Sequence, residues 1–156
     1  MLKANIKQDG KTTIVELSGA IDEETNSALG ELYSKASKDL IISFKDVDYI
    51  NSLGIRSWIN FIRHIEEGRS VTFRDCTPDV VMQMNLISNF RGNAKIESFL
   101  GEYTCDNCGE EGLISFKVTN RKELDQLIAN QICPNCGSEF TLEEDEENYL
   151  QFLDES

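Results

Sequence analysis

The chain has 156 residues, of which 40% are hydrophobic and 28% are charged, and this composition is typical of a soluble globular protein. No apolar run approaches the ~18 residues that a membrane-spanning helix requires, and the N-terminal sequence MLKANIKQDGK has no apolar signal region. We therefore predict a cytoplasmic protein without membrane insertion, with room for one domain and a small appendage.

The net charge of −13 lies mostly in the C-terminal third. Residues 1–100 contain 12 Lys and Arg against 14 Asp and Glu, whereas residues 101–156 contain 3 against 14. Such a negative field repels the phosphate backbone of nucleic acids and favours basic partners. We therefore expect protein partners and no nucleic acid.

In chain order, the first predicted elements are a hairpin, a helix and a buried strand. Residues 3–8 and 12–19 have strand patterns and enclose the turn sequence Asp-Gly-Lys. A helix is predicted to begin near residue 23, after Asp22, because apolar residues then recur at helical spacing. Residues 39–44 (DLIISF) form an almost continuous apolar run, which predicts a strand buried on both faces of a sheet.

The next segments continue the alternation of helices and strands. Apolar residues at helical spacing predict a helix over 53–66, which ends before Gly68. A strand follows at 70–76, and Pro78 opens a further helix. Residues 94–101 are either a last strand or a short helix. This order of elements predicts an α/β fold with helices packed against a mixed sheet.

Residues able to support enzyme chemistry are scarce. The sole histidine, His64, falls on the polar side of its predicted helix, so Ser or Cys nucleophiles have no obvious base. The phosphate-binding motifs GxxxxGK[ST] and GxGxxG are absent. Asp22, Glu23 and Glu24 stand at a helix start, where the helix dipole favours carboxylates. We read Cys76 as a buried packing residue and predict that the protein is not an enzyme.

The other cysteines form two Cys-x-x-Cys-Gly turns, which we call the first and second knuckle: Cys105, Cys108, Cys133 and Cys136 supply the thiols. In a chain without a signal peptide, such pairs point to metal rather than to disulfides. Four thiolates complete the tetrahedral shell of a structural zinc ion, Zn²⁺. A redox dithiol, an iron–sulfur cluster or a single iron ion remains an alternative.

The two knuckles, and the CPNCG sequence of the second one in particular, resemble a zinc ribbon. We therefore divide the chain into an α/β domain at 1–100, a zinc ribbon at 101–142 and an acidic tail at 143–156, with a link near Gly101-Glu102. The tail ends in apolar residues. These either dock on the chain's own domain or form a partner-binding peptide.

Two motifs of the first domain resemble the STAS domain, a family that includes bacterial anti-sigma factor antagonists and the cytosolic domains of sulfate transporters. IVELSGAIDEETNSAL matches a strand that ends in Leu-x-Gly-x-Leu-Asp, here with Asp22 last. LIISFKDVDYINSLGIRSWINF matches the strand, loop and helix around Asp-Ser-Ser/Ala-Gly-Leu-Gly. The resemblance covers roughly residues 5–100 and implies a STAS-like mixed β-sheet flanked by helices. The zinc ribbon is an addition to that domain.

The resemblance also implies a regulatory role for the second motif. In that family, a partner kinase that is also the anti-sigma factor phosphorylates the serine or threonine directly after the aspartate of the motif, and the resemblance implies that Ser52 is the corresponding residue. Asn51 stands where the family has aspartate, and Arg56 stands where it has glycine. The implied partner-binding residues are Asp22, Asn51, Ser52, Leu53, Gly54 and Arg56.

An alternative without phosphorylation remains for this motif. Ser52 is an N-cap of the helix and nothing more, since serine is a favoured capping residue. In that case the chain is an unphosphorylated structural or adaptor module of a larger signalling or transport complex.

Overall fold

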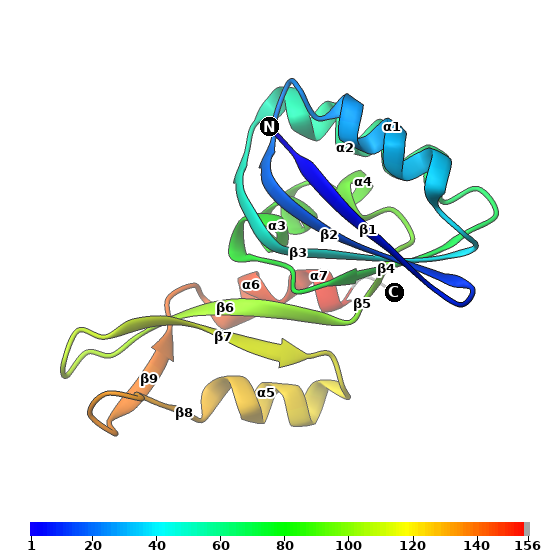
Figure 1. The fold of residues 1–156 in the computed structure, drawn as a ribbon. Helices are drawn as coiled ribbons and strands as arrows, with labels where there is room; N and C mark the ends of the chain where they lie inside the picture. The colour runs from blue at the N-terminus through cyan, green and yellow to red at the C-terminus, as the bar shows by residue number, and fades with distance from the viewer. Residues whose placement is uncertain (155–156) are drawn as a thin grey trace.

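The computed structural model describes residues 1–154 and contains two β-sheets (Figure 1). The first sheet consists of five strands: β1 (Lys3–Asp9), β2 (Thr12–Ile21), β3 (Asp39–Ile50), β4 (Ser70–Arg74) and β5 (Lys95–Ile96). They lie in chain order, with β1 antiparallel to β2 and all other neighbours parallel. The predicted mixed sheet is confirmed.

Helices accompany the first sheet as one connected layer: α1 (Asn26–Lys35), α2 (Ser52–Ile65), α3 (Pro78–Leu86) and α4 (Ser88–Arg91). α1 contacts α2, α2 contacts α4, and α4 contacts α3. The apolar stripe of α2 brings Trp58 into the core, where its ring lies 5.4 Å from Phe44 of β3 and 5.7 Å from Phe90 of α4. The indole N–H donates to the Phe90 carbonyl at 3.0 Å, so the buried polar atom is satisfied.

Element boundaries differ from the sequence prediction where side chains and neighbouring strands intervene. α1 begins at Asn26 rather than near 23, because Thr25 Oγ1 accepts from the amide of Asp22 at 2.8 Å and closes a turn first. β3 extends beyond the predicted 39–44 to Ile50, because it pairs with β2 along its whole length. The sequence analysis predicted that this strand is buried on both faces. Ile41, on the less covered face of the sheet, is only partly buried, so that prediction holds for one face only.

The second sheet is antiparallel and has four strands: β6 (Ser98–Thr104), β7 (Glu111–Lys117), β8 (Gln131–Ile132) and β9 (Glu139–Leu142). Their order is β7-β6-β9-β8. α5 (Arg121–Ala129) packs against this sheet, and the hydroxyl of Tyr103 donates to the Ile128 carbonyl at 2.8 Å. The Tyr103 ring stacks 5.5 Å from Phe140 of β9.

β6 joins the two sheets directly. Its first residues continue beside the end of β4, where the Cys76 amide donates to the Ser98 carbonyl at 3.1 Å and the Leu100 amide donates to the Cys76 carbonyl at 2.8 Å. The predicted link at Gly101-Glu102 lies inside this strand and is therefore no linker. The ambiguous segment 94–101 forms β5 and the start of β6 rather than a helix.

The end of the chain, red in Figure 1, returns from β9 to the first domain as α6 (Glu146–Tyr149) and α7 (Gln151–Asp154) and contacts α3. Tyr149 and Phe152 are buried, and the Tyr149 hydroxyl donates to the Leu100 carbonyl at 2.5 Å. The predicted tail thus docks on its own chain, which removes these apolar side chains from any free partner-binding peptide. Residues 155 and 156 of the predicted tail lie outside the described residues.

Candidate functional site

The start of α2 lies where two parallel strands end side by side. Ile21 ends β2 and Ile50 ends β3, and the Asn51 amide donates to the Ile21 carbonyl at 3.0 Å. Asn51 has an extended backbone and caps α2, because its Oδ1 accepts from the Gly54 amide at 2.9 Å. The sequence alternative in which Ser52 is the N-cap is therefore wrong.

Both polar atoms of the Asn51 side chain form hydrogen bonds. While Oδ1 caps the helix, Nδ2 donates to Glu23 Oε2 at 3.0 Å. An aspartate at this position would set a second carboxylate against Glu23, and like charges this close repel. Asn51, which departs from the family motif, is therefore compatible with a neighbouring Glu23. The sequence analysis had explained Glu23 only by its favourable interaction with the helix dipole.

Ser52 is the first helical residue, and its side chain is exposed. Its hydroxyl has no hydrogen-bond partner within residues 1–154. Two exposed apolar side chains lie within three positions of it in the sequence: Leu53, which follows it and is 57% exposed, and Tyr49 at the end of β3, which is 55% exposed. The helix start therefore presents a free hydroxyl beside apolar surface.

A shallow groove runs along α2 beside Ser52. Its lining includes Ser52, Arg56, Asn60 and Arg63, which repeat every three or four residues along one helix face, and Asn26 at the start of α1. The sequence analysis named Arg56 but missed Arg63, although helical periodicity places both on the same side. An anion on Ser52 would lie next to this cationic face.

Two of the predicted partner-binding residues have structural roles. Gly54 is buried, and a Cβ added to it would lie 2.0 Å from the Ile21 carbonyl oxygen, so only glycine allows α2 to approach β2 this closely. Asp22 is partly buried, and its Oδ1 accepts from the Glu24 amide at 3.0 Å within its own turn. The other predicted partner-binding residues lie together at the start of α2 and are at least partly accessible to solvent: Asn51, Ser52, Leu53 and Arg56.

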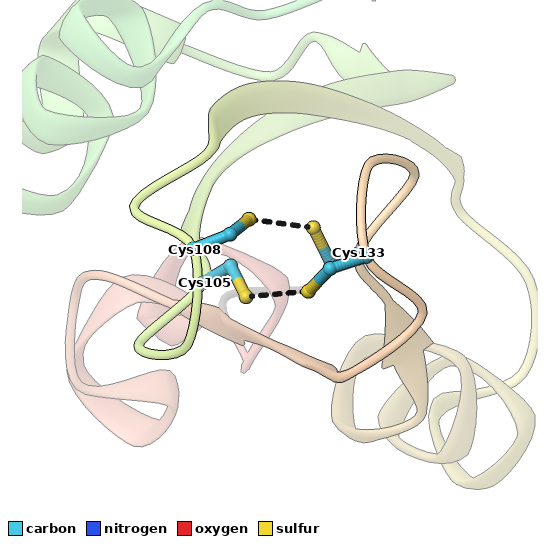
Figure 2. A group of neighbouring side chains, drawn as sticks. Cys105, Cys108 and Cys133 are labelled. Atoms are coloured by element: carbon cyan, nitrogen blue, oxygen red, sulfur yellow. Dashed lines mark hydrogen bonds between the residues drawn. The ribbon is translucent and has the colours of Figure 1, made fainter.

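The four cysteines of the two knuckles form a second candidate site. All four sulfur atoms lie within 4.8 Å of one another. The Sγ atoms of Cys105 and Cys136 are 3.5 Å apart, and those of Cys108 and Cys133 are 3.6 Å apart; Figure 2 shows the first knuckle facing Cys133. A tetrahedral zinc ion with Zn–S bonds of ~2.3 Å requires sulfur atoms ~3.8 Å apart. The donor set therefore fits a four-sulfur metal site.

The two knuckles have the same backbone construction. The Gly109 amide donates to the Cys105 carbonyl at 2.9 Å, and the Gly137 amide donates to the Cys133 carbonyl at 3.0 Å. Both glycines have positive φ angles, of 80° and 78°. Glycine adopts this conformation without strain, so each turn folds tightly enough to aim both of its thiols at one point.

Asparagines support the sulfur atoms across the site, and the sequence analysis missed them. Asn107 of the first knuckle lies 3.5 Å from Cys136 Sγ, and Asn135 of the second lies 3.5 Å from Cys108 Sγ. Both occupy the same position in Cys-x-Asn-Cys-Gly, and this shared residue was the available signal. Hydrogen bonds of this kind orient the ligands of a metal site.

The electrostatics of the cluster favour thiolates at the two exposed cysteines. Hydrogen bonds from Ser138 and then from Asn107 lower the pKa of Cys136 to about 5. Asn135 is the main cause that lowers the pKa of Cys108. The pKa of Cys105 rises to about 11: the Cys108 amide lowers it, but burial and the neighbouring thiols outweigh that effect. Thiolates are the form that binds metal.

The structure also places the other two reactive residues that the sequence analysis considered, His64 and Cys76. His64 is exposed on α2 and its Nδ1 lies 2.7 Å from the Asn60 carbonyl of the same helix. Cys76 is completely buried, as predicted, and burial raises the pKa of its thiol. None of the described helices is long and apolar enough to cross a membrane.

The first sheet and its helical layer define a small α/β domain with a mixed sheet. A family model described as the STAS domain matches residues 3–102, and the chain belongs to this family, as the sequence motifs predicted. No curated protein matches the chain closely enough to count as a relative.

Two solved structures illustrate the similarity to known proteins. An anti-sigma factor antagonist from Mycobacterium paratuberculosis has a TM-score of 0.51 and 15% identity, over 62% of this chain and 85% of that one. The unphosphorylated anti-sigma factor antagonist SpoIIAA has a TM-score of 0.48 and 12% identity, over 80% of this chain and 95% of that one. The first of these similarities supports the STAS fold of this chain.

Proposed function

We propose that this chain is a cytoplasmic, non-enzymatic regulatory module that binds a protein partner of the anti-sigma factor type at the start of α2. The observation that carries the proposal is the free hydroxyl of Ser52, exposed at the first helical position beside Leu53 and Tyr49. Apolar side chains beside a polar group are typical of a protein-binding surface. The family resemblance supplies the class of partner, an anti-sigma factor that is also a serine kinase.

Phosphorylation of Ser52 by such a partner would control binding. A phosphoserine carries about −1.5 to −2 charges at neutral pH. The first turn of α2 and Arg56 would accommodate this charge, with ~0.3–1 kcal/mol from the helix dipole, so the fold stays intact. A partner docked over Leu53 would have to bury the charge. This costs several kcal/mol, and each ~1.4 kcal/mol lowers the affinity tenfold.

The four cysteines hold a structural zinc ion in this proposal. Their sulfur spacing and the supporting asparagines fit a closed tetrahedral site, which leaves no open position for substrate. When bound, zinc supplies cross-linking rather than Lewis-acid chemistry. The cysteines fix the end of β6 to the segment that precedes β9.

The decisive experiment is quantitative affinity capture from an extract of the native cell. Wild type, Ser52→Ala and Ser52→Asp serve as baits, and Ser88→Asp is the matched control. Ser88 is also an exposed first residue of a helix, but it lies on α4. We expect Ser52→Asp to lose a partner that the other three baits retain. An identical set of partners for all four baits contradicts the switch.

A second candidate is an adaptor that binds its partner permanently and is never phosphorylated. The hydrogen bond between Asn51 and Glu23 favours the adaptor. Asn51 stands where the family motif has an acidic residue, and its side chain is engaged in this structural contact instead. Intact-mass measurement of the protein from its native cell separates the two candidates. A species heavier by about 80 Da that maps to Ser52 supports the switch, and its absence under all growth conditions supports the adaptor.

A further inference from the structure

A second groove lies between α3 and the C-terminal tail. It encloses a cavity of about 280 Å³ and shares no lining residue with the groove beside Ser52. Small-molecule and cofactor pockets usually span ~300–1,000 Å³ and are mostly apolar. This cavity lies at the lower end of that range and has room for one or two side chains of a peptide.

One wall of this groove is apolar and faces solvent. Met82 and Leu86 are one helical turn apart on α3, and they are 48% and 72% exposed. Pro78 and the buried Tyr149 continue the wall on either side. An exposed pair of large apolar side chains beside a cavity is typical of a protein-binding surface.

The rim of the same groove is acidic. Asp79 of α3, Glu102 of β6 and Glu144 before α6 come from three separate segments, and no Lys or Arg lines the groove. Burial and the neighbouring Glu143 raise the pKa of Glu102, followed by smaller contributions from Asp79 and Glu144. Mutually repelling carboxylates of this kind are relieved by an incoming cation.

Asn85 of α3 connects the two sides of the groove. Asn85 lines it, and Nδ2 of Asn85 donates to the carbonyls of Tyr149 and Asn148 at 3.0 and 3.4 Å, which fixes the orientation of the amide. Its Oδ1 is buried and is the one buried side-chain polar atom without a partner among the described residues. The hydrogen bonds from Nδ2 fix the tail against α3 at the groove.

We propose that this groove is a second protein-binding site, which takes a basic amphipathic segment of a partner protein. Apolar side chains of the segment cover Met82 and Leu86, and its Lys or Arg side chains meet the carboxylates of the rim. A second copy of this chain does not suit the groove, because each copy carries a net charge of −13 and would bring a like-charged rim.

The test uses a fluorescent helical peptide with a Leu face and a Lys face, and a counterpart with Glu at every Lys position. Fluorescence anisotropy with the full zinc-loaded chain measures both affinities. We expect binding of the Lys peptide alone, weakened as NaCl rises from about 50 to about 300 mM. Glu144→Lys and Leu86→Ser should each weaken it about tenfold.

Two matched variants control for the general acidity and hydrophobicity of the surface. Glu147→Lys makes the same charge change in the same tail, and Leu127→Ser removes a 53% exposed leucine from helix α5; neither residue lines the groove. Both should keep the affinity within about twofold of wild type. NMR shift changes on binding should cluster on α3, β6 and the tail, which shows that the variants act at the groove.

Three outcomes overturn the proposal. Equal binding of the Glu peptide removes the role of the acidic rim. Equal weakening by the control variants means that the acidic surface at large binds the peptide. Dimerisation of the chain that Leu86→Ser abolishes assigns the groove to a second copy instead. None of these outcomes bears on Ser52, which lies in the other groove.

Discussion

The STAS domain and the cysteine-containing sheet are stabilised in different ways. The STAS domain has an aromatic core in which Phe44 of β3 packs edge to face against Trp58 of α2 and Phe73 of β4. The cysteine-containing sheet has two short strands, of two and four residues, and a core centred on Tyr103, Phe116 and Phe140. A small segment gains little from burial, and in the proposed function a zinc ion held by the four cysteines supplies what the core does not.

The two regions are nevertheless not independent domains. β6 pairs with the second sheet while its first residues bond to the end of β4. The tail leaves β9 and buries Phe152 beside Phe99, with ring centroids 5.3 Å apart. The comparison therefore teaches that the cysteine-containing sheet is connected to the STAS domain at two places, one before and one after the four cysteines in the sequence.

The largest expected effect comes from removing a metal ligand. Cys133→Ser, or a chelator on wild type, should unfold the second sheet, because structural zinc contributes up to ~10–16 kcal/mol. Hydrogen exchange should show loss of protection in β7 and α5, while α2 stays protected. Asp106→Ser, an exposed change in the first knuckle, is the control and should keep stoichiometric zinc. Simultaneous loss of protection in α2 would mean that the two regions fold as one unit.

The next effect tests the anchor formed by the tail. Phe152 is fully buried, so Phe152→Ala should lower the free energy of unfolding by about 3–5 kcal/mol. Urea denaturation followed by the fluorescence of Trp58 measures this at a site in the other region. Gln151→Ala, which is exposed, should change it by less than about 0.5 kcal/mol. A loss below about 1 kcal/mol for Phe152→Ala would show that the tail is not part of the cooperative STAS unit.

Two glycines test the packing of the STAS domain itself. Gly54→Ala places a Cβ 2.0 Å from a backbone oxygen and should destabilise by about 3 kcal/mol, while zinc content stays unchanged. Gly30→Ala on α1 meets nothing within 4 Å and should stabilise by up to ~1 kcal/mol through helix propensity. Denaturant midpoints of the two variants should therefore move in opposite directions. Equal shifts would contradict the close approach of α2 to β2.

The smallest effect is on the pH dependence. A hydrogen bond from Arg74 lowers the pKa of Glu97, so its stabilising contribution is present at neutral pH and is lost as pH falls through the folded-state pKa. Burial and Glu143 raise the pKa of Glu102, so stability there falls as pH rises. At pH ~7, Glu97→Gln should destabilise, and Glu102→Gln should stabilise, each by less than ~1 kcal/mol because both residues are exposed. Shifts of the same sign in thermal unfolding would contradict these assignments.

Sequence patterns predicted those features that depend on neighbours in the chain. The helix predicted over 53–66 is α2, at Ser52–Ile65, because helical periodicity is local. The two knuckles converge as their repeated Cys-x-x-Cys-Gly pattern indicated. The capping residue was assigned wrongly, because Asn51 and Ser52 are both good caps and only backbone geometry distinguishes them.

Contacts between distant segments escaped the sequence analysis. The hydrogen bond from Asn51 to Glu23 spans 28 positions, and Asn107 reaches Cys136 across 29. The groove of α3 exists only because the tail returns to it. No periodicity or propensity encodes such pairs, since each depends on which surfaces meet after folding.

The sequence by itself determined the STAS motifs, the alternation of strands and helices, the pairing of the four cysteines in two knuckles and the acidic C-terminal third. The tertiary structure decided that β6 of the second sheet also bonds to Cys76 after β4, that the tail is docked, and that Asn51 caps the helix while the Ser52 hydroxyl has no partner among residues 1–154. The physical reason is the range of the interactions. Backbone propensity and ligand spacing act over a few residues, whereas burial and hydrogen-bond pairing depend on the packed whole.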